Sequence, residues 1–135
     1  MKITVCSDLH LEFSGIELKN TQDADVLILS GDVTIAEDLH DHKIGSEDQP
    51  SFGISGLSHR QEMALRTRNF FKQVSNEFEN VIYVAGNHEF YGGRWNASLD
   101  HLREETSRFS NIHFLERSSV KIDNVTFVGG TLWVI

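Results

Sequence analysis

Three short apolar runs, each ending abruptly in small or polar residues, constrain the fold of this chain more than any other feature. They are Ile3–Cys6, the run within Asp25–Ser30, and Val81–Ala85. Their apolar residues are continuous and do not alternate with polar ones, which is typical of strands buried on both faces of a parallel sheet. We therefore expect neighbouring parallel strands in the core.

Two helical patterns accompany these strands. Apolar residues from Met63 to Phe78 recur at spacings of three and four, which predicts a helix with one apolar stripe and Ser58 as its cap. Asn96–Phe109 predicts a second helix, capped by Asn96, with a thinner stripe. The order strand, helix, strand, helix favours an α/β architecture.

The last third of the chain reads as short strands, at Ile112–Leu115, Val120–Ile122 and Val125–Val128. Asp123-Asn124 joins the last two as a two-residue hairpin turn of the kind that needs positive φ. Residues 37–59 contain the only proline, three glycines and several acids and histidines, so we expect a loop insertion there. The 135 residues are the size of one domain.

Composition excludes several classes of function. The net charge is −8 and no basic cluster stands out, so the sequence offers no strong patch for nucleic acid. No segment is apolar for long enough to cross a membrane, and MKITVCSDLH is too soon polar for a signal peptide. Cys6 is the only cysteine, which suits a reducing compartment, and we expect a cytoplasmic protein.

Polar residues able to bind cations follow each of the three apolar runs. The first is followed by Ser7-Asp8-Leu9-His10, the second by Gly31-Asp32 and the third by Gly86-Asn87-His88. Ligands of open α/β sheets lie beyond the carboxyl ends of the strands, so these residues should converge. Oxygen and nitrogen ligands without thiolate suit Mn, Fe or Zn, with Mg and Ni as further candidates.

Each of these pieces also has a structural interpretation. Asp8 could cap the turn that follows it, and Asp32 could be an ordinary turn acid. Their joint occurrence, each at a strand end, favours a metal site. Two ions about 3.5–4 Å apart there would activate water for attack on a phosphoryl group. Gly31 and Gly86 would let the backbone turn sharply beside the ligands.

The set DLH, GD and GNHE resembles the calcineurin-like metallophosphoesterase superfamily, and GNHEFYGG is similar to its small phage and bacterial members. The resemblance runs from Met1 to about Trp133. It implies a metallophosphoesterase-like β-sandwich flanked by helices, with a dinuclear metal centre at the strand ends. It also implies hydrolysis of phosphomonoesters or phosphodiesters.

The resemblance assigns roles residue by residue. Asp8 and His10 would hold the first metal, Asp32 would bridge both, and Asn87 would bind the second. His88 would contact the scissile phosphate and assist departure of the leaving group, a task suited to a side chain that titrates near neutrality. Glu89 is expected to have a structural role, orienting the loop or starting the next helix.

Arg94 follows Gly92-Gly93 and could bind a substrate phosphate, since a guanidinium group presents a fork of donors. A surface salt bridge is the alternative interpretation.

The resemblance also implies ligands that this sequence lacks. The superfamily supplies further histidines, two of them from a Gly-His-x-His motif, and no such motif occurs here. The chain ends in the apolar Trp133-Val134-Ile135, so we expect an N-terminal portion of the fold whose C-terminal half is missing. The second metal should then bind weakly. Exposed sheet surface should favour self-association or a completing chain.

These observations leave two main hypotheses. The first is a metal-dependent phosphoesterase acting on a phosphoester substrate, impaired by the missing half. The second is a non-catalytic remnant of that fold which binds a metal or a partner protein. A subunit whose site is completed by another chain is a third interpretation.

Overall fold

The computed structural model describes residues 1–40 and 59–132. Its elements, in chain order, are β1 (Ile3–Cys6), β2 (Val26–Ser30), α1 (Ala36–His40), α2 (His59–Glu77), β3 (Asn80–Val84), the 3-10 helix η2 (His88–Phe90), α3 (Trp95–Thr106), β4 (Ile112–Phe114), β5 (Ser118–Ile122) and β6 (Val125–Gly129). This order confirms the predicted α/β class.

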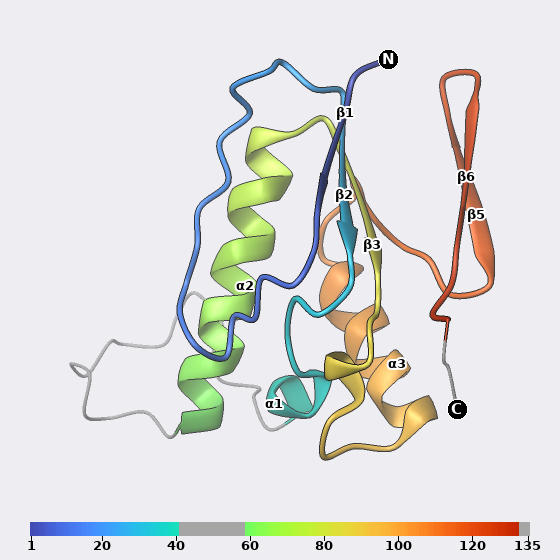
Figure 1. Cartoon of the computed structure of the whole chain (residues 1–135). Coiled ribbons are helices and arrows are strands. Elements are labelled where there is room, and N and C mark those ends of the chain that lie inside the picture. Colours follow the sequence, from blue (N-terminus) through green and yellow to red (C-terminus); the bar gives the residue numbers. More distant parts are fainter. Residues whose placement is uncertain (41–58, 133–135) are drawn as a thin grey trace.

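Strands β1 to β4 form one parallel sheet in the order β1-β2-β3-β4. Cys6 pairs with Leu29 and Ser30 pairs with Val84, so the carboxyl ends of the first three strands lie next to one another. Figure 1 shows these strands running in one direction toward an edge where α1 and η2 lie. The parallel arrangement expected from the continuous apolar runs is therefore confirmed.

The sheet separates two apolar clusters. Figure 1 shows α2 on one side of the sheet and the hairpin β5–β6 on the other. Alternate residues of the two central strands, such as Leu29 and Tyr83, pack with the helices in the main cluster. The residues between them, such as Val26 and Ile82, pack with Leu115 and with the antiparallel hairpin β5–β6. Since a strand directs successive side chains to opposite faces, continuous apolar runs fill both clusters at once.

Edge strand β1 departs from the prediction of burial on both faces. Ile3 and Val5 are 44% and 62% exposed, on the face where the hairpin packs over the central strands. In the described residues, this strand pairs on one side only. The prediction that β1 is buried on both faces is therefore wrong for the face that carries Ile3 and Val5.

The helix predicted from Met63 to Phe78 is confirmed as α2, and its apolar stripe is buried. The cap assigned to Ser58 lies outside the described residues. The second predicted helix is confirmed as α3, but it begins one residue earlier, at Trp95, and ends three residues earlier, at Thr106. Its N-cap is Arg94, which makes no side-chain cap hydrogen bond. The Asn96 amide was taken for a cap signal, but this residue is already inside the helix.

The hairpin forms as expected, although β5 begins earlier, at Ser118, and β6 runs to Gly129. Asp123 has the positive φ, 54°, that the turn was predicted to need. The predicted loop insertion at residues 37–59 begins as helix, because α1 continues to His40, while residues 41–58 lie outside the description. No helix in the described part of the chain has the length and apolar character that crossing a bilayer requires.

The buried ring of Phe71 offers a test of this packing. It is fully buried and contacts the ring of Tyr83, with the centroids 5.5 Å apart. Replacement by alanine should lower the free energy of unfolding by about 3–5 kcal/mol. Phe13→Ala is the matched control, because Phe13 is 78% exposed and should change the value by about 0.5 kcal/mol or less. Urea denaturation of both variants measures this, and equal losses would contradict the assigned core.

Candidate metal centre

Two glycines bring the ends of β2 and β3 into direct backbone contact. A Cβ atom on Gly31, whose φ is +100°, would lie 2.9 Å from Cα of Gly86. A Cβ atom on Gly86 would lie 2.4 Å from Oδ1 of Asp32. No side chain fits at either place, so the expectation that these glycines permit a close approach is confirmed.

The segment after β1 continues to pair with the segment after β2. The amide of Asp8 donates to the carbonyl of Gly31 at 3.0 Å, and the amide of His10 donates to the carbonyl of Asp32 at 3.0 Å. Asp8, His10 and Asp32 have φ of 57°, 48° and 54°. Residues other than glycine rarely adopt this left-handed region, and such strain gathers at functional sites.

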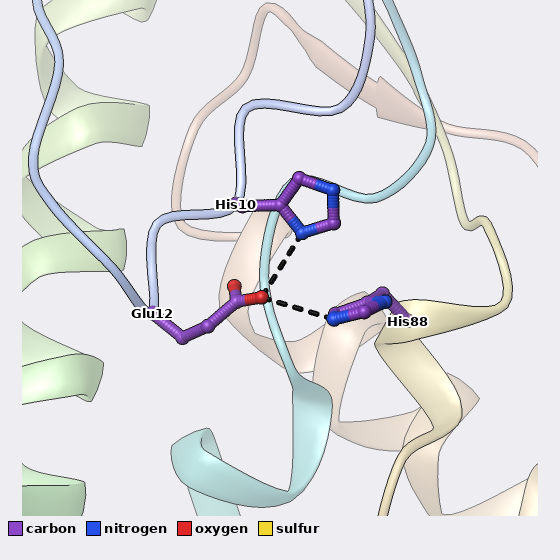
Figure 2. Close-up of side chains that lie close together, drawn as sticks. All are labelled: His10, Glu12 and His88. Carbon is purple, nitrogen blue, oxygen red and sulfur yellow. Dashed lines mark hydrogen bonds and ion pairs between the residues drawn. The ribbon is translucent and has the colours of Figure 1, made fainter.

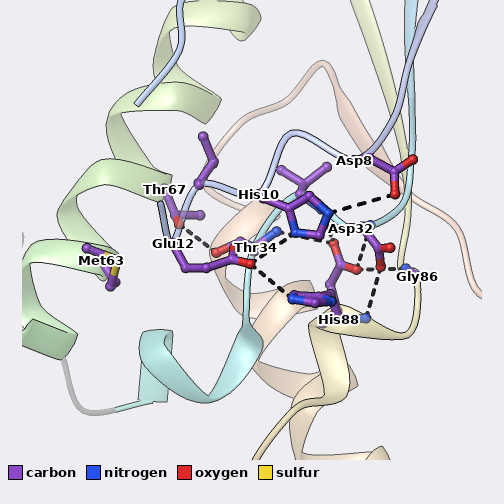
Figure 3. A network of polar contacts seen from close by, with 12 residues as sticks. Asp8, His10, Glu12, Asp32, Thr34, Met63, Thr67, Gly86 and His88 are labelled. Atoms are coloured by element: carbon purple, nitrogen blue, oxygen red, sulfur yellow. Dashed lines mark hydrogen bonds and ion pairs between the residues drawn. The ribbon is translucent and has the colours of Figure 1, made fainter. Parts of the chain in front are cut away.

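Asp8, His10 and Asp32 each offer a ligand atom, and these atoms lie within 4.8 Å of one another. Nε2 of His10 is 3.8 Å from Oδ1 of Asp8. Figure 3 shows the three side chains gathered where β1 and β2 end. Two carboxylates and an imidazole are a donor set that divalent first-row metals accept, so the residues fit such an ion.

Hydrogen bonds tune two of these groups. The hydroxyl of Ser7 donates to Oδ2 of Asp8 at 2.6 Å and is the largest cause of the lowered pKa of that carboxyl. The pKa of His10 is raised, first by its hydrogen bond to Glu12, although desolvation opposes the shift. Asp8 is therefore held in the charged form that binds cations.

Asn87 and His88 follow Gly86 at the same edge. The amide of His88 donates to Oδ1 of Asp32 at 2.9 Å, which links the end of β3 to the predicted bridging ligand. The ring of His88 meets the ring of His10 edge-on, with 4.5 Å between centroids. The side chain of Asn87 is exposed. Its ligation of a second metal stays a prediction.

Glu12 is the site residue that sequence reasoning missed. Its Oε1 lies 3.0 Å from Nδ1 of His10 and 3.1 Å from Nε2 of His88, so it stands between the two rings (Figure 2). The signal was present in the alternation around it, because Leu9 and Leu11 pack into the core while His10 and Glu12 do not. This alternation places Glu12 on the same side of the segment as His10, so Glu12 could have been predicted as a further site residue.

Glu89 has the structural role that was expected of it. Its fully buried carboxylate accepts hydrogen bonds from the amides of Asp32, Val33 and Gly86 at 2.9, 2.8 and 2.7 Å, and from the hydroxyl of Tyr83 at 2.6 Å. Burial raises the pKa of Glu89, and these hydrogen bonds oppose that shift. The pKa of Tyr83 is raised well above its usual value, so its hydroxyl stays a donor.

Arg94 makes no described contact with the predicted metal ligands. It is exposed and lies at the N-cap of α3, after the turn through Gly92. No hydrogen bond or ion pair among the described residues joins it to Asp8, His10, Asp32 or His88. Contact with a substrate phosphate stays a prediction.

Comparison with known proteins identifies the family. The family model described as calcineurin-like phosphoesterase matches residues 1–132. The chain belongs to this family. A calcineurin-like phosphoesterase of this kind is expected to use divalent metals, and the gathered ligands of the described residues agree with that expectation.

A similar protein is found in a virus. It is the uncharacterized protein L509 of Acanthamoeba polyphaga mimivirus, 31% identical over 71 residues. Those residues are 49% of this chain and 25% of that protein, so the chain matches about a quarter of its relative's length. This similarity supports a common ancestry of the matched part, and it gives no information about the substrate.

The carboxylate of Glu89 should be essential for holding the strand ends of this candidate metal centre together. Glu89→Ala leaves the Tyr83 hydroxyl and several buried amides without an acceptor, so it should lower the free energy of unfolding by at least about 3 kcal/mol. Tyr83→Phe removes one donor and should cost about 1 kcal/mol. Urea denaturation compares them, and equal costs would show that Glu89 does not join the strand ends.

Proposed function

We propose that this chain is a metal-dependent phosphoesterase that hydrolyses phosphomonoesters or phosphodiesters. The observation that carries the proposal is the gathering of Asp8, His10 and Asp32, with ligand atoms within 4.8 Å of one another, at the strand ends of a calcineurin-like phosphoesterase. His88 lies against His10 and is linked to Asp32 through its amide.

Each residue has a role in this proposal. Asp8 and His10 would hold a first divalent ion, Asp32 would be shared with a second, and Asn87 would contribute to the second. Mn, Fe or Zn suit these ligands, with Mg and Ni as further candidates. Bound ions would supply Lewis acidity and an activated water.

His88 contacts the phosphate and assists the leaving group. Since Nε2 of its ring faces Glu12, the phosphate contact would be made through Nδ1. The hydrogen bond from its amide to Asp32 holds the backbone of His88 beside a predicted metal ligand.

One observation favours the alternative, a non-catalytic remnant that binds a metal or a partner. The two groups of possible metal ligands within the described residues both contain His10. They are therefore not independent sites, and binding of a single ion would fit them. Exposed apolar residues, Val5 on β1 and Val128 on β6, would suit self-association or a completing chain.

Metal binding can be tested at Asp32. Asp32→Asn tolerates the positive φ and keeps an oxygen for the His88 amide, but it loses the negative charge. We expect Mn²⁺ affinity, measured by titration calorimetry, to fall at least tenfold. Asp100→Asn on α3 is the matched control, because Asp100 is exposed and outside the candidate site. Equal affinities in both variants would remove Asp32 from the centre.

Hydrolysis can be tested at His88. The protein with Mn²⁺ should hydrolyse bis-p-nitrophenyl phosphate or p-nitrophenyl phosphate, and His88→Ala should lower kcat by about 10²–10⁴-fold with its metal content unchanged. His113→Ala is the control, because its ring contacts Asn80 at the amino end of β3, whereas the candidate site lies beyond the carboxyl end of that strand. One bound metal or none, without turnover in the parent protein, would favour the remnant.

A further inference from the structure

Glu12 occupies a position that neither stability nor the roles proposed above account for. Its side chain is only 11% exposed, and a single oxygen, Oε1, lies between Nδ1 of His10 and Nε2 of His88 at 3.0 and 3.1 Å (Figure 2). The other oxygen, Oε2, is buried and has no hydrogen-bond partner among the described residues. A half-satisfied buried carboxylate is unfavourable for folding, so its retention calls for another reason.

The backbone around Glu12 is firmly held. Leu11 is buried in the main cluster, and its amide donates to the carbonyl of Val33 at 2.8 Å. Nη1 of Arg66, on α2, donates to the carbonyl of Leu11 at 2.7 Å. The carboxylate is therefore presented from a fixed segment, and the two histidines are positioned against it.

The contact with His10 determines which ring nitrogen carries hydrogen. A carboxylate accepts hydrogen bonds, so Nδ1 of His10 is the donor in the 3.0 Å contact. In the neutral ring the lone pair then belongs to Nε2, the nitrogen 3.8 Å from Oδ1 of Asp8. A metal binds only a nitrogen without hydrogen, and carboxylate partners of this kind fix the tautomer and orientation of histidine ligands.

We propose that Glu12 is a positioning residue that fixes the Nδ1–H tautomer of His10, so that Nε2 faces Asp8 and Asp32, and that the same oxygen orients His88. One carboxylate thus couples a predicted metal ligand to the predicted catalytic histidine. The inference rests on the proposed metal centre, but its first consequence, the tautomer of His10, is a property of the metal-free protein.

The first measurement concerns this tautomer. Long-range ¹H–¹⁵N spectra of the metal-free, histidine-labelled protein, recorded at an alkaline pH where the imidazole is neutral and assigned with His10→Gln, should show the Nδ1–H form of His10. Glu12→Ala should shift the ring toward the Nε2–H form, and Glu12→Gln, which keeps the length and one accepting oxygen, should shift it less. An unchanged tautomer in Glu12→Ala overturns the proposal. If Glu12→Ala does not fold, an unchanged tautomer in Glu12→Gln overturns it.

The second measurement concerns metal binding. Glu12→Ala should weaken Mn²⁺ binding by about 10–100-fold, with the number of ions bound at saturation unchanged. The control is Glu79→Ala, an exposed glutamate next to the amino end of β3. An affinity within twofold of the parent overturns the proposal. Loss of one ion per chain at saturation also overturns it, because Glu12 would then be a ligand itself.

The two measurements separate this proposal from the proposed function. If the parent chain binds metal but hydrolyses neither ester, the phosphoesterase proposal fails, while the tautomer and the affinities still decide the role of Glu12. If the parent binds no metal, the proposed centre fails and the tautomer alone decides.

Discussion

The site depends on one buried carboxylate that joins the ends of two strands. Glu89 accepts hydrogen bonds from the amides that follow β2 and from the amide of Gly86 after β3. Main-chain groups at the carboxyl edge of a parallel sheet lose their strand partners, and burying them unpaired is costly. Glu89 supplies those partners, and this fixes the separation of Asp32 and His88, which the structure then links directly.

A second constraint is steric and acts through the glycines. A side chain on Gly86 would overlap the carboxylate of Asp32. Since glycine has none, the chain after β3 can lie directly against Asp32 at the end of β2. The segment after β1 is then registered by its hydrogen bonds to Gly31 and Asp32. Main-chain contacts and the Asp32–His88 hydrogen bond thereby hold three separate parts of the chain in one small region.

Much of this could be predicted from the sequence, because three apolar runs occur in order and each is followed by residues able to bind cations. Each piece alone also fits an ordinary turn, and only their joint occurrence favours a shared site. What could not be predicted depends on tertiary neighbours. The exposure of Val5 follows from which strand lies at the edge, and a local apolar pattern carries no such information. The role of Glu12 follows from contact with His88, which is 76 residues away (88 − 12). The cap of α3 was misplaced because Asn96 has the side chain of a typical cap, whereas the observed cap, Arg94, makes no side-chain cap hydrogen bond.

The distribution of unfavourable features bears on whether the site has been kept for chemistry. Asp8, His10 and Asp32 hold positive φ, and Glu12 keeps a buried oxygen without a partner. Apart from the bridging contacts, none of these features strengthens the core, while α2 and the central strands follow ordinary packing rules. A chain that no longer needed the site could relax each of them by single substitutions, for example glycine or asparagine at Asp32. Positive φ also occurs away from this edge, at Asp23, Arg117 and Asp123, so strain alone does not mark the site. The combination of strained backbone with gathered ligand atoms at Asp8, His10 and Asp32 favours a binding site over a purely structural relic.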